Sequence, residues 1–272
     1  MQISKEKKMN SHSVNNESKL KIMTFNIRNG GNNDGINSIC YRHSVIMRMF
    51  EREAADIIGF QEISSEERRW IRSALGTEYV LVGGGRDANY RGEGCSVAFR
   101  ADIMELISMD TLWLSNTPNV SGSRYEDSGQ SIFPRLMHVL TLKHKYANEP
   151  VTVINTHLDH VGIDARRKEL SQIFTYLSEH DLNGILMGDF NMLPSSSEMS
   201  EFTEKVNRLG WDDVTKDLGG TFHQFGTLTP ASKIDYIYTN MSCDNVHRVT
   251  DVTAEGTFCS DHFPICASIE LP

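Results

Sequence analysis

The stretch Gly184-Ile185-Leu186-Met187-Gly188-Asp189-Phe190-Asn191 (GILMGDFN) decides how the rest of the chain is interpreted. Its first half is an apolar run, which is typical of a buried strand. Asp189 and Asn191 follow at the strand end, and residues two apart in extended chain point to the same side. A single polar residue there would be a cap or a turn residue, whereas a matched pair indicates a site.

Length and composition describe an ordinary globular protein. The chain has 272 residues, with 39% hydrophobic and 23% charged residues. This suits one large domain or two small ones, and no apolar run approaches the roughly 20 residues of a membrane span. Residues 1–18 are polar and lack the apolar core of a secretory signal. We therefore expect a flexible polar leader over 1–18 and a single domain over 19–272.

Cysteine usage and net charge narrow the compartment and the partners. The five cysteines are an odd number and none has CxxC spacing, which argues against a disulfide framework and favours a reducing, cytoplasmic location. The formal net charge of −9 disfavours long duplex nucleic acid, which basic proteins usually bind. No membrane association and no obligate protein partner are indicated.

Strand-like and helical patterns alternate along much of the chain, which is typical of an α/β domain with mixed sheets. Predicted strands cover residues 20–25, 56–60, 95–100, 103–109, 135–143, 151–156, 184–188, 234–239 and 264–270. Apolar residues at helical spacing or capping patterns predict helices over 41–55, 164–180 and 196–209. The stretches 83–94 and 115–134 are predicted to be long loops, which are usually functional in compact domains.

Polar residues of a few types lie at the ends of these strands. They are Asn26, Glu62, His157, Asp189, Asn191, Asp235, Asp261 and His262. Each alone has an ordinary explanation as a turn residue, a cap or a packed histidine. Together they suit metal-assisted hydrolysis of a phosphate ester, because Mg²⁺ prefers carboxylate and amide oxygens. Imidazole and amide groups can donate to phosphoryl oxygens, and a carboxylate can activate water.

Six short motifs carry a resemblance to a known family. They are Thr24-Phe25-Asn26-Ile27-Arg28, Gly59-Phe60-Gln61-Glu62, Asn155-Thr156-His157-Leu158-Asp159, Gly188-Asp189-Phe190-Asn191, Lys233-Ile234-Asp235-Tyr236-Ile237 and Ser260-Asp261-His262-Phe263-Pro264. In this order they resemble the endonuclease/exonuclease/phosphatase family, over about residues 20–272. The resemblance implies a deoxyribonuclease I-like, four-layer α/β sandwich: two mixed β-sheets packed face to face, with helices outside and the site at one edge.

The resemblance also implies roles around a metal ion. Glu62, with Asn26 nearby, would hold Mg²⁺, for which Mn²⁺ could substitute. Asp261 would help the metal directly or through water. Asp189 would activate or position the attacking water, and Asn191 would bind a phosphoryl oxygen.

Other residues would contact the phosphate in such a site. His157 would donate to it. His262, oriented by Asp235, would stabilise the transition-state charge or assist proton transfer. Arg135, at the start of a predicted strand, matches a phosphate-contacting arginine of some members.

Two features depart from the DNA-repair members of that family. Arg28 stands where members that act on abasic DNA carry an Asp, and Asn26-Ile27-Arg28 instead resembles a bacterial branch. Gly220-Thr221-Phe222-His223 resembles the same branch, in which His223 is either a substrate contact or a structural residue. Asp159 and His160 either line the site or belong to the approach to the next helix.

These observations favour a Mg²⁺-dependent phosphoesterase acting on a small or single-stranded phosphorylated substrate. Aromatic and basic residues in or beside the two long loops are candidates for a base or sugar pocket: Tyr90, Arg91, Trp113, Arg124 and Tyr125. The alternatives are a nuclease or deadenylase, a lipid phosphodiesterase, and a non-catalytic binding module. The complete set of polar strand ends disfavours the last of these.

Overall fold

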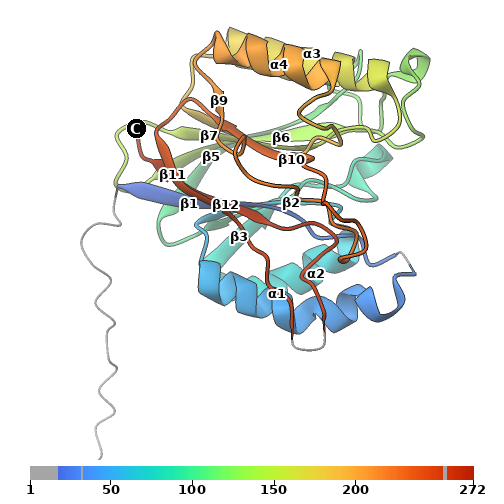
Figure 1. The fold of residues 1–272 in the computed structure, drawn as a ribbon. Coiled ribbons are helices and arrows are strands. Elements are labelled where there is room, and N and C mark those ends of the chain that lie inside the picture. Colours follow the sequence, from blue (N-terminus) through green and yellow to red (C-terminus); the bar gives the residue numbers. More distant parts are fainter. Residues whose placement is uncertain (1–17, 32, 254–255) are drawn as a thin grey trace, which may run out of the picture.

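Two six-stranded sheets lie face to face in the computed structural model, which describes residues 18–31, 33–253 and 256–272 (Figure 1). The first sheet has the order β11 (Cys243–Arg248), β12 (Ile265–Glu270), β1 (Lys19–Asn26), β2 (Ile57–Gln61), β4 (Val97–Arg100) and β3 (Tyr79–Val82). The second has the order β5 (Met104–Trp113), β6 (Leu136–His144), β7 (Val151–His157), β8 (Gly184–Asp189), β10 (Asp235–Thr239) and β9 (Asp212–Asp213). Both sheets are mixed, since β1 with β2 and β7 with β8 are parallel pairs.

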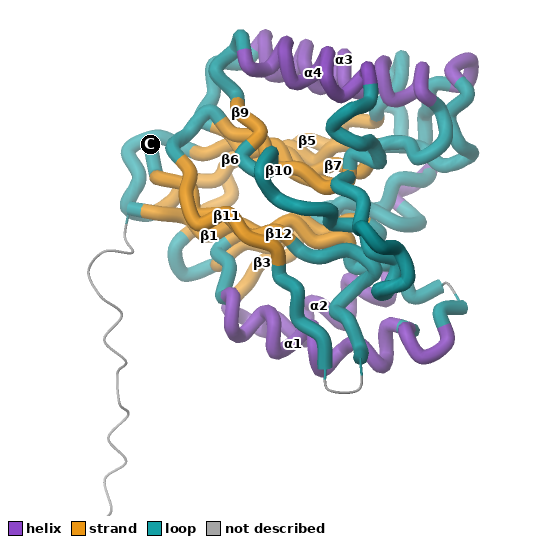
Figure 2. Tube along the Cα trace, in the orientation of Figure 1, coloured by secondary structure: helices purple, strands orange, loops and turns teal. Residues whose placement is uncertain are grey.

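One pair of helices covers the outer face of each sheet (Figures 1 and 2). The helices are α1 (Ile39–Glu53) and α2 (Ser65–Leu75) on the first sheet, and α3 (Ile163–Glu179) and α4 (Ser197–Asn207) on the second. The predicted four-layer α/β sandwich of two mixed sheets is therefore confirmed. No helix in the described ranges is both long enough and apolar enough to cross a membrane.

The sequence patterns missed one helix and three strands. Helix α2 buries only Glu67, Ile71 and Leu75, so its apolar periodicity is weak, and its clearest signal is the capping box of Ser64 and Glu67. The strands β3, β9 and β11 lie at or near sheet edges and carry mostly exposed or half-buried residues. The predicted leader over 1–18 lies, apart from Ser18, outside the described residues.

The core has three apolar layers, one between the sheets and one under each helix pair. The strands β2, β7, β8 and β10 are buried along their whole length, as their apolar sequences predict. Their burial on both faces leaves the strand ends as the places where these strands can present polar groups to solvent.

Strand register brings the polar ends to one edge of both sheets. Asn26 pairs with Gln61 across the parallel strands β1 and β2, and His157 pairs with Asp189 across β7 and β8. The antiparallel strand β10 begins at Asp235, which pairs with Asp189.

A buried carboxylate braces the connection between β7 and α3. The Oε2 atom of Glu169, in α3, accepts a hydrogen bond of 2.9 Å from the backbone N–H of Asp159. Burial raises the pKa of Glu169 to about 7, from an ordinary value of 4.5. Because the pKa of Glu169 is raised in the folded state, protonated Glu169 contributes fully to the stability of the fold below pH 4.5. This contribution is lost as the pH rises through about 7.

We therefore expect the stability difference between the wild type and Glu169→Gln to depend on pH. From pH 5 to pH 8 the free energy of unfolding of the wild type should fall by up to about 3 kcal/mol relative to that of this variant, because one pKa unit corresponds to about 1.4 kcal/mol. Urea unfolding at several pH values measures the difference, and Glu179→Gln, at an exposed position of the same helix, is the control. A difference that is constant across this range would contradict the raised pKa of the buried Glu169 carboxyl group.

Candidate functional site

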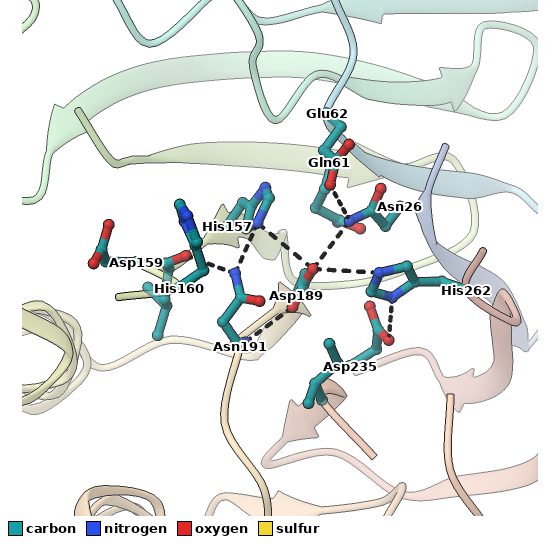
Figure 3. A network of polar contacts seen from close by, with 12 residues as sticks. Asn26, Gln61, Glu62, His157, Asp159, His160, Asp189, Asn191, Asp235 and His262 are labelled. Carbon is teal, nitrogen blue, oxygen red and sulfur yellow. Dashed lines mark hydrogen bonds and ion pairs between the residues drawn. The ribbon is translucent and has the colours of Figure 1, made fainter. Parts of the chain in front are cut away.

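The centre of the site is a chain of carboxylate and amide groups that joins the two sheets (Figure 3). The Nδ2 atom of Asn26 donates to Glu62 Oε1 and to Asp189 Oδ2, each at 3.0 Å. The Oδ1 atom of Asn26 accepts from the backbone N–H of Arg28 at 3.0 Å. In this arrangement the amide N–H₂ group of Asn26 bridges the two carboxylates.

Two histidines flank Asp189: His157 is the last residue of β7, and His262 lies three residues before β12 (Figure 3). His157 Nε2 lies 3.5 Å and His262 Nε2 lies 3.8 Å from Asp189 Oδ2. The Nδ1 atom of His262 donates to Asp235 Oδ2 at 2.8 Å. Asn191 donates from Nδ2 to His157 Nε2 and to the Leu158 carbonyl, both at 2.9 Å. The five residues predicted as catalytic therefore lie together.

Burial and neighbouring charges give these groups different protonation states. Burial, together with the nearby Asp235, raises the pKa of Asp189 to about 7. Burial lowers the pKa of His157 well below its ordinary value, helped by Arg135 and Arg86. Burial also opposes the charged form of His262, but the carboxylate of Asp235 outweighs it and raises the pKa of His262. His157 is thus the neutral imidazole of the pair, and His262 is the cationic one.

Backbone strain marks the same residues. Arg28, Glu62 and Asn191 have φ values of 58°, 59° and 52°, a left-handed conformation that is uncommon for residues other than glycine. Such conformations persist where the surrounding structure enforces them, and they concentrate at functional sites. Each of the three lies one or two residues after a strand that ends in a polar residue, and each lines the cavity.

Asp261 forms an ion pair with the guanidinium group of Arg28. The Nε atom of Arg28 lies 3.7 Å from Asp261 Oδ2, and Arg28 also forms two hydrogen bonds of 3.1 Å with Asp34. Burial raises the pKa of Asp261, and the nearby Glu62 adds to this effect. Glu62 and Asp261 are therefore two carboxylates that repel each other within one cavity.

A buried arginine, which was not predicted from the sequence, connects two loops at the edge of the first sheet. Arg42 in α1 donates to the carbonyls of Ile27, Arg28 and Cys259 at 2.7–2.9 Å. These carbonyls belong to the loop after Asn26 and to the loop before Asp261. Arg42 thereby sets the distance between two groups of site residues that are far apart in the sequence.

The site opens into a cavity of about 490 Å³. Its lining includes most of the predicted residues, namely Glu62, Arg135, His157, Asp189, Asn191, Asp261 and His262. Among the lining residues that were not predicted from the sequence are Arg86, Glu93 and Phe133. They come from the two long loops, so the loops were identified correctly and their pocket residues were not. The loop residues that were predicted to form a base or sugar pocket do not line this cavity: Tyr90, Arg91, Trp113, Arg124 and Tyr125.

Arg135 and His223 occupy different positions relative to this cavity. Arg135 is buried in the cavity wall, where its Nη2 atom donates to His160 Nδ1 at 2.9 Å. His223 packs against Phe258 and Phe263 and accepts at Nδ1 from the backbone N–H of Gly226 at 2.9 Å. His223 is not among the cavity-lining residues, and its role in substrate binding stays a prediction.

The donor set fits a hard divalent cation. Single atoms of Glu62, His157 and Asp189 lie within 4.8 Å of one another, and Asp261 adds a carboxylate. Mg²⁺ and Mn²⁺ prefer oxygen ligands, which the carboxylates of Glu62, Asp189 and Asp261 supply. Burial raises the pKa of Asp261 and repulsion from Glu62 adds to the effect, so a cation between the two carboxylates would favour their charged forms.

Fold and site together define a class of proteins in which two packed mixed sheets present carboxylate, amide and imidazole groups at one edge. Residues 23–262 match the model of the Endonuclease/Exonuclease/phosphatase family, and the chain belongs to this family. The resemblance drawn from the six motifs is thereby confirmed. No curated protein sequence matches the chain closely enough to count as a relative.

Solved structures give the same assignment. An endonuclease/exonuclease/phosphatase from Bacteroides vulgatus is 28% identical with a TM-score of 0.83, over 94% of this chain and 100% of that one. The mannosyl-6-phosphatase Bt3783 of Bacteroides thetaiotaomicron is 26% identical with a TM-score of 0.78, over 91% and 98%. TDP2 from D. rerio, complexed with a single-strand DNA product, is 17% identical with a TM-score of 0.72, over 92% and 99%, and shows the fold alone.

We expect Arg42→Lys to lower the free energy of unfolding by about 2–4 kcal/mol, because a lysine cannot satisfy all the buried carbonyls that Arg42 serves. Urea unfolding measures the change. Arg48→Lys, at an exposed position of the same helix, should change stability by less than about 0.5 kcal/mol. Equal, small effects of both substitutions would contradict the bridging role of Arg42.

Proposed function

We propose that the protein is a metal-dependent phosphoesterase that hydrolyses a small phosphorylated substrate by direct attack of water. The observation that carries the proposal is the arrangement around Asp189. One carboxylate oxygen of this residue faces Asn26, His157 and His262 at the floor of a solvent-connected cavity. Carboxylate, amide and imidazole groups in one place are the parts that water attack on a phosphoryl group requires.

Asp189 is the residue that positions the water. Its Oδ1 atom accepts the backbone N–H of Asn191 at 2.9 Å, and Asn26 donates to Oδ2 at 3.0 Å, so the carboxylate is held in one orientation. A pKa raised to about 7 by burial suits a group that accepts a proton from water near neutral pH.

His262 and Arg135 are the groups that would act on the phosphoryl oxygens. The imidazolium of His262, held by Asp235 through Nδ1, points its Nε2–H toward Asp189 and the cavity. A fixed positive donor at this place stabilises the negative charge that develops on a phosphoryl oxygen or on the leaving group. Arg135 supplies a further donor from the cavity wall, and Asn191 is held in place because its Nδ2 atom donates to His157 Nε2 and to the Leu158 carbonyl.

Glu62 and Asp261 are the residues that would hold the metal, with Asn26 orienting Glu62 through its amide. A divalent cation bound there would supply Lewis-acid stabilisation of the phosphoryl charge. Arg28, beside Asp261, is a second positive charge that the chain itself provides.

Three observations support a small substrate. The cavity of about 490 Å³ has the size of a small-molecule site. The net charge of −9 disfavours a long polyanion. Among the similar proteins more than 25% identical, one is described as a mannosyl-6-phosphatase. We therefore place sugar phosphates first among the candidate substrates.

A single-stranded nucleic acid is the second candidate. Arg28, Arg86 and Arg135 line the cavity together with Phe133 and Phe222, and basic groups with aromatic faces also bind single strands. Activity on an oligonucleotide would fall steeply with salt, whereas activity on a small monoester would not.

The proposal extends to a cytoplasmic location. All five cysteines are free thiols, and three of them, Cys95, Cys259 and Cys266, are buried. Unpaired cysteines are typical of a reducing compartment.

The test is hydrolysis by purified protein with Mg²⁺ or Mn²⁺ of mannose 6-phosphate, bis-p-nitrophenyl phosphate and single-stranded DNA and RNA. We expect turnover of the monoester, loss of turnover with EDTA, and a fall of at least about 10³-fold in Asp189→Asn, which removes the water-positioning carboxylate. Circular dichroism of Asp189→Asn checks that the fold is retained. Activity within tenfold of wild type in a folded Asp189→Asn protein would exclude the role given to Asp189.

A further inference from the structure

The part of the cavity beside Glu62 is built by the loop over residues 83–94. This loop folds back on itself: the backbone N–H of Arg86 donates to the Glu93 carbonyl at 2.7 Å. Gly94 exchanges backbone hydrogen bonds with Ile63, directly after Glu62. A Cβ atom at Gly94 would lie 2.1 Å from the Gly84 carbonyl oxygen, so only glycine permits this closure. These contacts hold the loop beside Glu62 at the edge of the sheets.

Arg86 and Glu93 point from this loop into the cavity as an ion pair, with 2.8 Å between Nη2 and Oε2. The guanidinium of Arg86 stacks on the ring of Phe133, 4.5 Å from its centroid. Trp113 anchors the backbone below, since its Nε1–H donates to the Arg86 carbonyl at 2.6 Å. This group of residues, Arg86, Glu93, Phe133 and His160, is called the loop subsite below.

Two observations, one in the loop subsite and one on the neighbouring Arg135, indicate a binding place for a ligand with acceptor and donor groups. Arg86 is only 8% exposed, yet within the described part of the chain its Nε atom has no hydrogen-bond partner. Arg135, 2% exposed, similarly lacks partners for Nε and Nη1. Buried donors without acceptors are unfavourable, so these donors mark a place where a ligand supplies the missing oxygens.

The charges of the loop subsite favour a neutral polar ligand over a second anion. Arg86 is balanced by Glu93, and Arg135 has Asp159 Oδ2 at 3.6 Å from its Nε atom. His160 accepts at Nδ1 from Arg135, so its ring is neutral and its Nε2–H is a donor. Carboxylate acceptors, guanidinium and imidazole donors and an aromatic face together match the hydroxyl groups and the ring of a sugar.

We propose that the loop subsite binds the leaving group of the substrate and selects a polyhydroxylated ring, with Glu93 and Arg86 contacting its hydroxyl groups and Phe133 packing against its face. This inference rests on the proposed function, since it names the substrate class of the same site. Selectivity follows because a buried polar site rejects a ligand that leaves its groups unpaired.

The experiment compares mannose 6-phosphate with cyclohexylmethyl phosphate, which keeps a six-membered ring on the same CH₂–O–phosphate but has no hydroxyl groups. We expect the wild-type kcat/KM for the sugar to be about 100-fold higher or more. Glu93→Gln should reduce that ratio about 10- to 100-fold by lowering only the sugar's value. Phe133→Ala, at a 40% exposed position where misfolding is not expected, should also reduce it. Glu126→Gln, an exposed loop carboxylate outside the cavity, is the control.

A binding measurement separates failure of this inference from failure of the proposed function. Calorimetry with Asp189→Asn protein and Mg²⁺ should show mannose 6-phosphate binding at least tenfold more tightly than cyclohexylmethyl phosphate, and the added Glu93→Gln substitution should remove the difference. This result supports the loop subsite even if the wild type turns over neither compound. Equal binding of the two compounds, or equal loss of activity on both in Glu93→Gln, would overturn it.

Discussion

The structure depends on one buried side chain that joins the two sheets beneath the site. Asn155, in β7, donates from Nδ2 to the carbonyls of Phe60, Cys95 and Ser96 and accepts at Oδ1 from Gln61 Nε2, at 2.7–3.2 Å. The sheets can approach this closely because residue 59 is glycine: a Cβ atom there would lie 2.6 Å from Met187 and 2.9 Å from Asn155. Since these bonds are buried, breaking one leaves unsatisfied groups in the core, so the relative position of the sheets is strongly held.

This junction explains why a site can be assembled from six distant segments. Asn26 and Glu62 come from one sheet, and His157 and Asp189 come from the other (Figure 3). These residues meet only if the strands of both sheets end side by side. The contacts of Asn155 hold the sheets in this position, one or two residues before the strand ends. Arg28, Glu62 and Asn191 adopt strained left-handed conformations because their side chains turn inward at strand ends that lie close together.

Much of the fold and of the central site could be predicted from the sequence, because apolar strands that end in Asp, Asn, Glu or His are visible as short local patterns. Helix α2 could not, since its buried face is only three residues wide. Arg42 could not either: its partners Ile27 and Cys259 are backbone carbonyls, and no sequence pattern encodes those. The loop over 83–94 was recognised by its glycines, but which of its charged residues turn inward depends on how the loop closes on Ile63.

We propose that Glu62 and Asp261 hold a divalent cation beside Asp189. The most direct measurement is anomalous X-ray diffraction from crystals of the protein grown with Mn²⁺. We expect an anomalous peak within coordination distance, about 2 Å, of the Glu62 carboxylate. A peak only elsewhere, for example among Glu53, His247 and Cys266, or no peak at saturating Mn²⁺, would contradict it.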